Sequence, residues 1–238
     1  MTDFSVFLEA LEEDAFEEKP VDIEEHQCFV NGIEIHHHPD STKSRSQYLP
    51  LLIQAVAEDP DDDRNTYYCA RELFFNGQVE ASVNMFKVHL SLERATWAPE
   101  RAWSMRYLAK MLPEEREAWL LRACAEYPSG REPWVDLAKH YHQKEWWTSC
   151  HYAAMRALEI KEKPLLYLNE EESWGSLPWD LGALSAYHIG LYAKAVELNK
   201  HALYIDNNNL RLITNHQFYL KKYHPDLQGY KHTHHDVF

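Results

Sequence analysis

The stretch that decides the fold is 131–163, REPWVDLAKHYHQKEWWTSCHYAAMRALEIKEK. Its first half repeats apolar residues at helical spacing: Trp134, Leu137, Ala138 and Tyr141. Its second half is another amphipathic segment, with the small residue Cys150 early in it. Small residues let two helices approach closely, whereas large rings fill the space between one helix pair and the next. The stretch therefore predicts a helix–turn–helix unit.

Related units lie on both sides of this stretch. One starts near Asp63 and another near Ser176, and a degenerate one between about 97 and 130 has a turn at Pro113. The spacing is about 34 residues, with one longer connection around 161–176. The pattern resembles the tetratricopeptide repeat, W-x2-L-G-x2-Y, with Ala138 in place of the glycine. We expect an all-α, tetratricopeptide-like solenoid over residues 41–220.

The two ends have a different character. Residues 1–40 are acidic, and they combine a short amphipathic segment with CFVNGIEIHHH, which predicts a strand or a small hairpin around Asn31-Gly32. Residues 221–238 form a His-rich tail. The expected organisation is thus an N-terminal segment at 1–40, a helical-repeat domain at 41–220 and a tail at 221–238.

Composition restricts the class of function. With 24 Lys and Arg against 38 Asp and Glu, the formal charge is -14, which disfavours nucleic acid as a partner. No apolar run reaches the length of about 18 residues that a membrane span needs, and the acidic N-terminus does not resemble an export signal. The four scattered cysteines predict reduced, buried thiols. These features favour a cytoplasmic protein.

A second resemblance concerns function. The run HHHPDSTKSRSQYLPLLIQAVAEDPDDDRNTYYCARELFFNGQ resembles the junction, in some family 2 glycosyltransferases, between the catalytic domain and a helical-repeat tail. Later segments such as APERAWSMRYLAK and GLYAKAVELNKHALYIDNNNLRL are similar to that tail, so the likeness extends over about residues 33–215. A catalytic half of this family needs βαβ units of about 30 residues or more each, and the residues before the His run are too few. The resemblance implies a relative of the tail without most of the catalytic domain.

Several clusters could hold a metal ion. Asp61, Asp62 and Asp63 follow a proline between two predicted helices, so we interpret them as turn and helix-capping residues. On a strand His36 and His38 would share a face, and with Asp40 they are candidate ligands of a divalent metal. The tail offers a comparable group: His232, His234, His235 and Asp236. We nevertheless expect no cofactor, with solvent-exposed histidines as the simpler interpretation.

The candidate functional surface is the groove lined by the first helix of each pair. The predicted partner-binding residues are Arg64, Tyr67, Arg71, Phe74, Arg101, Lys139 and His142, with Met105 and Val135 in the same register. Basic and aromatic groups on an acidic protein favour an acidic peptide or extended chain as the ligand. For Tyr67-Tyr68 and Trp146-Trp147 we expect one ring of each pair in the core and the other at the surface.

Two functions are compatible with these observations. The first is a non-catalytic scaffold that binds a protein partner, because no catalytic motif is recognisable. The second is an accessory part of a split glycosyltransferase, whose nucleotide-sugar-binding half would be a partner on another chain. In that case residues 28–38 would add a strand to the partner's sheet.

Overall fold

The computed structural model describes residues 48–223, and all of the regular secondary structure in this range is helical. The predicted N-terminal helix and hairpin, and the His-rich residues after 223, lie outside the described residues. The helices are α2 Tyr48–Glu58, α3 Asp63–Phe75, α4 Val79–Ser91, α5 Ala98–Met111, α6 Arg116–Glu126, α7 Arg131–Gln143, α8 Trp147–Glu159, α9 Glu171–Trp174, α10 Leu177–His188, α11 Tyr192–Ile205 and α12 Leu210–Tyr223, with a 3-10 turn η2 at Pro113–Glu115.

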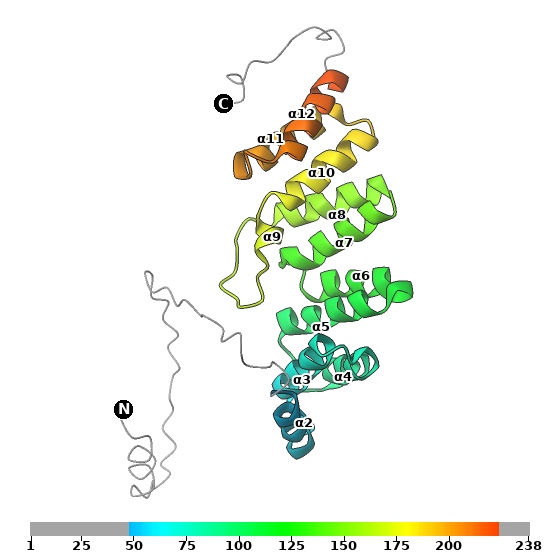
Figure 1. The fold of residues 1–238 in the computed structure, drawn as a ribbon, viewed down its shortest axis with the longest axis vertical. Coiled ribbons are helices and arrows are strands. Elements are labelled where there is room, and N and C mark those ends of the chain that lie inside the picture. Colours follow the sequence, from blue (N-terminus) through cyan, green and yellow to red (C-terminus); the bar gives the residue numbers. More distant parts are fainter. Residues whose placement is uncertain (1–47, 224–238) are drawn as a thin grey trace, which may run out of the picture. The chain divides into compact units, whose positions relative to one another are not determined.

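The helices pack as consecutive pairs. Helix α3 packs on α4, α5 on α6, α7 on α8 and α10 on α11, and each pair also packs on the next. Figure 1 shows the pairs following one another along the chain from α2 to α12. This arrangement confirms the prediction of an all-α, tetratricopeptide-like solenoid. The pair α5–α6 also confirms the degenerate unit, since η2 starts at Pro113 and replaces the glycine turn found elsewhere.

Aromatic rings fill the space between some helices, and small residues let other helices approach closely. In the first pairs, the Phe86 ring stacks on Tyr107 with centroids 4.9 Å apart, and Tyr67 approaches the same ring edge-on at 6.2 Å. Between α8 and α10, a Cβ built on Gly182 would lie 3.7 Å from that of Ala154. Bulkier residues there would push the helices apart, so small residues do allow the close approach expected from the sequence.

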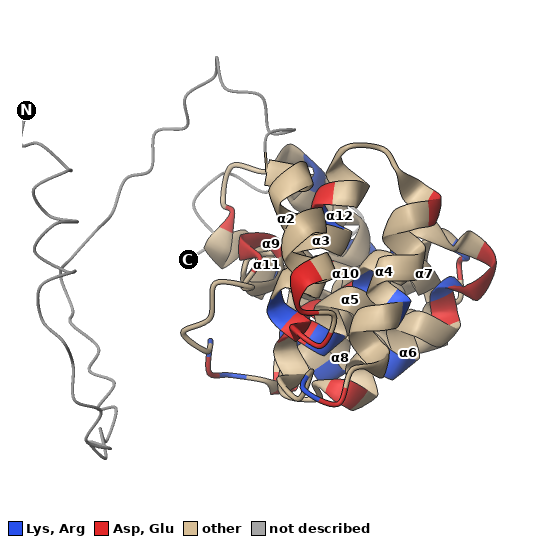
Figure 2. Ribbon diagram, turned by 90° about the horizontal axis from the view of Figure 1, so that it is seen from below, with Lys and Arg blue, Asp and Glu red and all other residues tan. Residues whose placement is uncertain are grey.

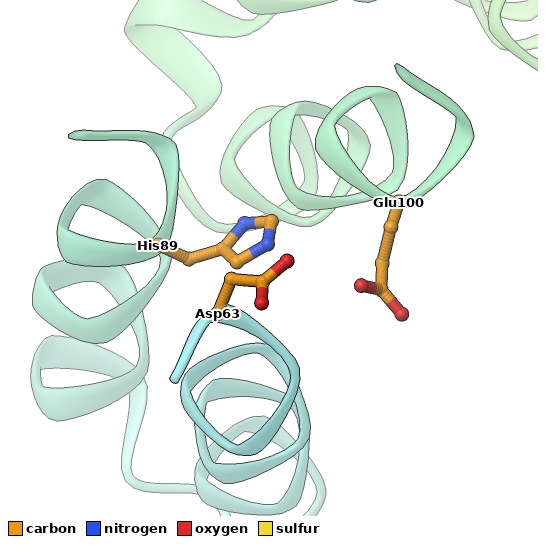
Figure 3. A group of neighbouring side chains, drawn as sticks. All are labelled: Asp63, His89 and Glu100. Carbon is orange, nitrogen blue, oxygen red and sulfur yellow. The ribbon is translucent and has the colours of Figure 1, made fainter. Parts of the chain in front are cut away.

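The acidic run before α3 has the capping role expected of it. Asp62 is the N-cap of α3, and its side chain accepts a hydrogen bond of 2.8 Å from the backbone N–H of Asn65. This bond satisfies a donor that would otherwise lack a partner in the first turn. Asp63, the first residue of the helix, points instead toward α4 and α5 (Figure 3).

The turn between α10 and α11 needs a glycine. Gly190 has φ +82°, and a Cβ placed there would meet nothing within 4 Å. Gly190→Ala is therefore expected to lower the free energy of unfolding by about 1–2 kcal/mol through backbone strain alone. Urea denaturation followed by circular dichroism measures this change. Gly190→Asn should be milder, because asparagine tolerates the left-handed region. Equal losses for Ala and Asn would contradict this interpretation.

Two further expectations concern the thiols and the membrane. Cys69, Cys124 and Cys150 are free and buried, as expected, and Cys28 lies outside the described residues. Burial raises the pKa of the Cys124 thiol to about 12, so this group is protonated and unreactive at neutral pH.

Within residues 48–223, no helix combines the length and the apolar character that crossing a bilayer requires.

Candidate functional site

The long connection predicted around 161–176 lies on the first helices of two repeats. We call residues 160–170, between α8 and α9, the connecting loop. In Figure 1 it leaves α8, passes α7 and reaches α5. Leu168 anchors it, because this side chain is 6% exposed and belongs to the main hydrophobic core. The loop is therefore a packed part of the fold.

Arg106 on α5 holds the end of this loop. Its side chain is 2% exposed, and its Nε donates a hydrogen bond of 2.7 Å to Asp136 on α7. Its Nη2 donates to Glu170 at 2.5 Å, and the guanidinium carbon lies 3.9 Å from the centre of the Trp103 ring. The two carboxylates raise the pKa of Arg106 against the opposing effect of burial. One buried cation thus joins α5, α7 and the loop.

Helix α7 supplies a second set of contacts to the loop and α9. The carboxylate of Glu132, 1% exposed, accepts hydrogen bonds from the indole N–H of Trp174 at 2.8 Å and from the backbone N–H of Glu170 at 3.2 Å. Nearer the surface, Lys139 donates to Glu172 at 2.6 Å. An acidic and aromatic segment of the chain therefore occupies part of the face on which we predicted an acidic peptide to bind.

Tyr167 brings the loop to the start of α5. Its hydroxyl donates to Glu100 on α5 at 2.5 Å, and its ring lies 5.8 Å from that of Trp97. Burial, followed by the hydrogen bond to Glu100, raises the pKa of Tyr167, so the phenol remains protonated at neutral pH.

Next to the loop, a hollow of about 250 Å³ opens between α5, α6 and α7. It is lined by Arg106, Ala109, Lys110, Arg116, Leu120, Asp136, Lys139, His140 and Gln143. Arg106 and Lys139 are engaged by carboxylates. Lys110 contacts the Tyr107 ring, and Arg116 donates to a backbone carbonyl and to Gln143. Among the described residues, neither Lys110 nor Arg116 forms an ion pair with a carboxylate.

Charges elsewhere on the described helices are mixed. Figure 2 shows Lys and Arg interspersed with Asp and Glu along the ribbon, without separation into large regions of one sign. Arg101, for example, donates to Glu126 at 2.6 Å and also to the backbone carbonyls of Leu90 and Ala95. Other described cations, such as Lys87 and Arg122, also form no ion pair with a described carboxylate, so what marks the hollow is that two such cations, Lys110 and Arg116, line it together.

The predicted groove residues fall into three groups. Tyr67, Met105 and Val135 are buried in the core, and Phe74 packs on Tyr107 with ring centroids 5.1 Å apart. Arg101 fastens α5 to α6 and to the turn before it. The accessible members are Arg64, Arg71, Lys139 and His142. Of all the predicted residues, only Lys139 lines the hollow.

The register explains this distribution. On α3 the face near the loop carries Arg64, Tyr68 and Arg71, whereas Tyr67 lies about 100° away and is fully buried. A first helix of such a pair is covered on two sides, by its partner and by the next pair, so apolar residues occupy more than half of its circumference. Periodicity then identifies the helix without specifying which remaining strip faces a ligand.

The two aromatic pairs behave differently. Tyr67 is buried and Tyr68 partly exposed, as expected for neighbours on a helix. For Trp146-Trp147 the expectation is wrong, because neither ring is fully buried. Trp147 stacks on His188 with centroids 3.9 Å apart, while Trp146, at 49% exposure, lies against Tyr141. These residues begin α8, where the chain enters the helix from the surface.

Several residues that shape the site were not predicted from the sequence. These are Glu100, Arg106, Glu132, Asp136 and Glu170. A usable signal was charge at apolar helix positions, since Arg106 and Glu132 interrupt otherwise buried surfaces of α5 and α7. Buried charges are nearly always paired, so each of them implies an oppositely charged or hydrogen-bonding partner elsewhere in the chain. The candidate ligands His36, His38 and Asp40, with the tail histidines, lie outside the described residues.

Comparisons with known proteins add little to this description. No protein-family model matches the sequence, and no curated protein matches it either. Among solved structures, the chain is similar to a thermophilic tetratricopeptide-repeat (TPR) protein of Thermus thermophilus, with 15% identity and a TM-score of 0.44. That match covers 74% of this chain and 90% of the other. The resemblance to the tail of family 2 glycosyltransferases stays a prediction.

Proposed function

We propose that this protein is a non-catalytic scaffold that binds an acidic, extended segment of a partner protein at the hollow between α5, α6 and α7. The observation that carries the proposal is the pair Lys110 and Arg116, which line this hollow without a carboxylate partner among the described residues. The whole chain has a formal charge of -14, whereas the hollow places in one depression two cations that have no ion pair within residues 48–223. Acidic side chains complement such a site.

The connecting loop supports the choice of ligand. Its acidic end, together with α9, binds to the same two helices through Glu170 on Arg106 and Glu172 on Lys139. The face therefore already accommodates carboxylates of the chain itself, one from the end of the loop and one from α9. A partner segment would lie beside the loop and complete the row of charge pairs toward Lys110. Helix pairs of this kind commonly present such surfaces to extended chains.

Charge reversal in the hollow tests the proposal. The probe is a fluorescein-labelled hexaglutamate peptide, titrated with the full chain at low salt and followed by fluorescence anisotropy. Lys110→Glu with Arg116→Glu is expected to weaken binding by about tenfold or more, because two attractive interactions become repulsive. Glu172→Gln, which frees Lys139, should instead tighten binding by about two- to fivefold, the range typical of one exposed ion pair.

A matched control reverses two other cations. Lys87→Glu with Arg122→Glu makes the same change in net charge on α4 and α6, at positions that do not line the hollow. The affinity of this control for hexaglutamate should stay close to that of the wild type, apart from a small loss caused by its more negative net charge. Equal weakening in both double variants would show that only overall charge matters, and the proposed site would then be wrong.

A further inference from the structure

A cluster of three ionisable groups lies where α3, α4 and α5 meet, apart from the hollow. Asp63 comes from the first turn of α3, His89 from the last turn of α4 and Glu100 from the first turn of α5 (Figure 3). One ligand-type atom of each residue lies within 4.8 Å of those of the other two. His89 is 1% exposed and Glu100 3% exposed, so this three-helix cluster is largely removed from water.

The imidazole of His89 has one nitrogen held and one nitrogen open. Nδ1 lies 2.9 Å from the hydroxyl of Ser104 on α5, a hydrogen bond that fixes the ring. Within the described part of the chain, Nε2 has no hydrogen-bond partner. A ring that is oriented through one nitrogen by a second residue, with the other nitrogen open, is the usual arrangement of a histidine that ligates a metal.

The carboxylates around this ring lack a cation of their own. Asp63 forms no ion pair and accepts no hydrogen bond among residues 48–223, and Glu100 accepts one hydrogen bond, from Tyr167. Arg64 and Arg71 attract the Glu100 carboxylate from a distance, but neither forms an ion pair with it. Two carboxylates and an imidazole therefore converge with nothing positively charged between them.

An acidic cluster beside the connecting loop differs in this respect. Asp136, Glu170 and Glu172 also bring ligand-type oxygens within 4.8 Å of one another. There, however, the protein supplies the positive charge, because Arg106 pairs with Asp136 and Glu170 while Lys139 pairs with Glu172. The acidic cluster is thus neutralised from within, and the three-helix cluster is not.

Helix dipoles explain only part of the three-helix cluster. Asp63 and Glu100 each lie near the positive N-terminal end of their own helix, where a carboxylate is favoured. That effect operates for exposed side chains as well, so it does not account for the convergence of both groups on a buried imidazole. The geometry of Asp63, His89 and Glu100 points to a binding site for a divalent first-row transition metal ion, with Zn²⁺ as the best match.

The ligand set indicates the class of metal. Imidazole with carboxylates suits Zn²⁺ and its neighbours in the first transition row, whereas Mg²⁺ and Ca²⁺ prefer oxygen ligands alone. Bonds of about 2.0–2.2 Å to Zn²⁺ would draw the three ligand atoms closer together than in the metal-free arrangement. Because the ligands come from α3, α4 and α5, the ion would join the first two helix pairs. Tyr167, bonded to Glu100, would connect the site to the loop.

Histidines outside the described range could also bind zinc, so the experiment uses a background without them. In this background the full chain carries glutamine at positions 26, 36, 37, 38, 224, 232, 234 and 235. Isothermal titration with Zn²⁺ after EDTA treatment is expected to give one site per chain, and no heat with Mg²⁺. Thermal unfolding should shift upward with Zn²⁺, because an ion that binds the folded state in preference to the unfolded state stabilises the fold.

Variants at the site decide the question. Asp63→Asn and Glu100→Gln should each weaken Zn²⁺ binding by about tenfold or more. Glu172→Gln is the matched control, since it removes a carboxylate from the neutralised acidic cluster, and its affinity for Zn²⁺ should not change. Circular dichroism of the metal-free variants verifies that they fold. Unaltered affinity in Asp63→Asn and Glu100→Gln, or no binding in the background that lacks the histidines outside residues 48–223, would overturn the assignment. Neither result affects the hexaglutamate measurement.

Discussion

Arg106→Ala is expected to lower the free energy of unfolding by about 3–5 kcal/mol, the range found when one partner of a buried ion pair is removed. The alanine would leave Asp136 without its partner at 2.7 Å and Glu170 without its own at 2.5 Å. It would also remove the guanidinium group that covers the Trp103 ring. Urea denaturation at neutral pH, followed by circular dichroism, measures the loss.

The surface pair Arg94–Asp59 provides the control for Arg106. Its two side chains are 61% and 54% exposed, and the nitrogen–oxygen distance is 3.1 Å. Exposed pairs contribute about 0–1 kcal/mol, so Arg94→Ala should change stability little. If both alanine variants lost the same free energy, Arg106 would not hold the loop in the way described above.

Phe86→Ala should cost a similar amount for a different reason. The Phe86 ring is 0% exposed, and it stacks on Tyr107 on one side while Tyr67 contacts its edge. Truncation leaves a cavity between the first two helix pairs, where the surrounding side chains are already packed. Removing a buried phenylalanine costs about 3–5 kcal/mol in such settings.

Val88→Ala on the same helix tests whether burial is the cause. Val88 is 42% exposed, so its truncation should change the free energy of unfolding by less than about 0.5 kcal/mol. Denaturant titrations of the two variants, compared with the same dependence of the free energy of unfolding on denaturant concentration, show whether the loss follows burial. A loss below about 1 kcal/mol for Phe86→Ala would mean that the ring contributes little to the interface between the pairs.

The sequence was sufficient to predict the helices and their pairing, because both depend on local patterns. Trp134 and Leu137 recur at helical spacing, and Pro113 marks a turn. The side of each first helix that a ligand could reach was predicted poorly. Tyr67 and Val135 are buried, although they share a register with Arg71 and Lys139. A helix covered on two sides has too narrow an open strip for periodicity to locate.

The site depends on contacts that no local pattern contains. Glu170 reaches Arg106 across 64 positions of sequence, and Tyr167 reaches Glu100 across 67. The same holds for the inferred metal ligands, since Asp63 reads as a capping residue and His89 as an ordinary helix-end histidine. Only the packing of α3, α4 and α5 brings these side chains together. Charge at an otherwise apolar position, as at Arg106, is the one local hint of such partnerships.

The route of the connecting loop changes how the repeats depend on one another. In an array of stacked helix pairs each unit normally touches only its neighbours, so one end can melt while the rest persists. Here the segment that leads into α10 is fastened to α5 through Arg106 and Glu170. Opening the second pair therefore also loosens the approach to the fourth. The connecting loop thus couples the second and fourth pairs directly, and we expect them to unfold in one cooperative step.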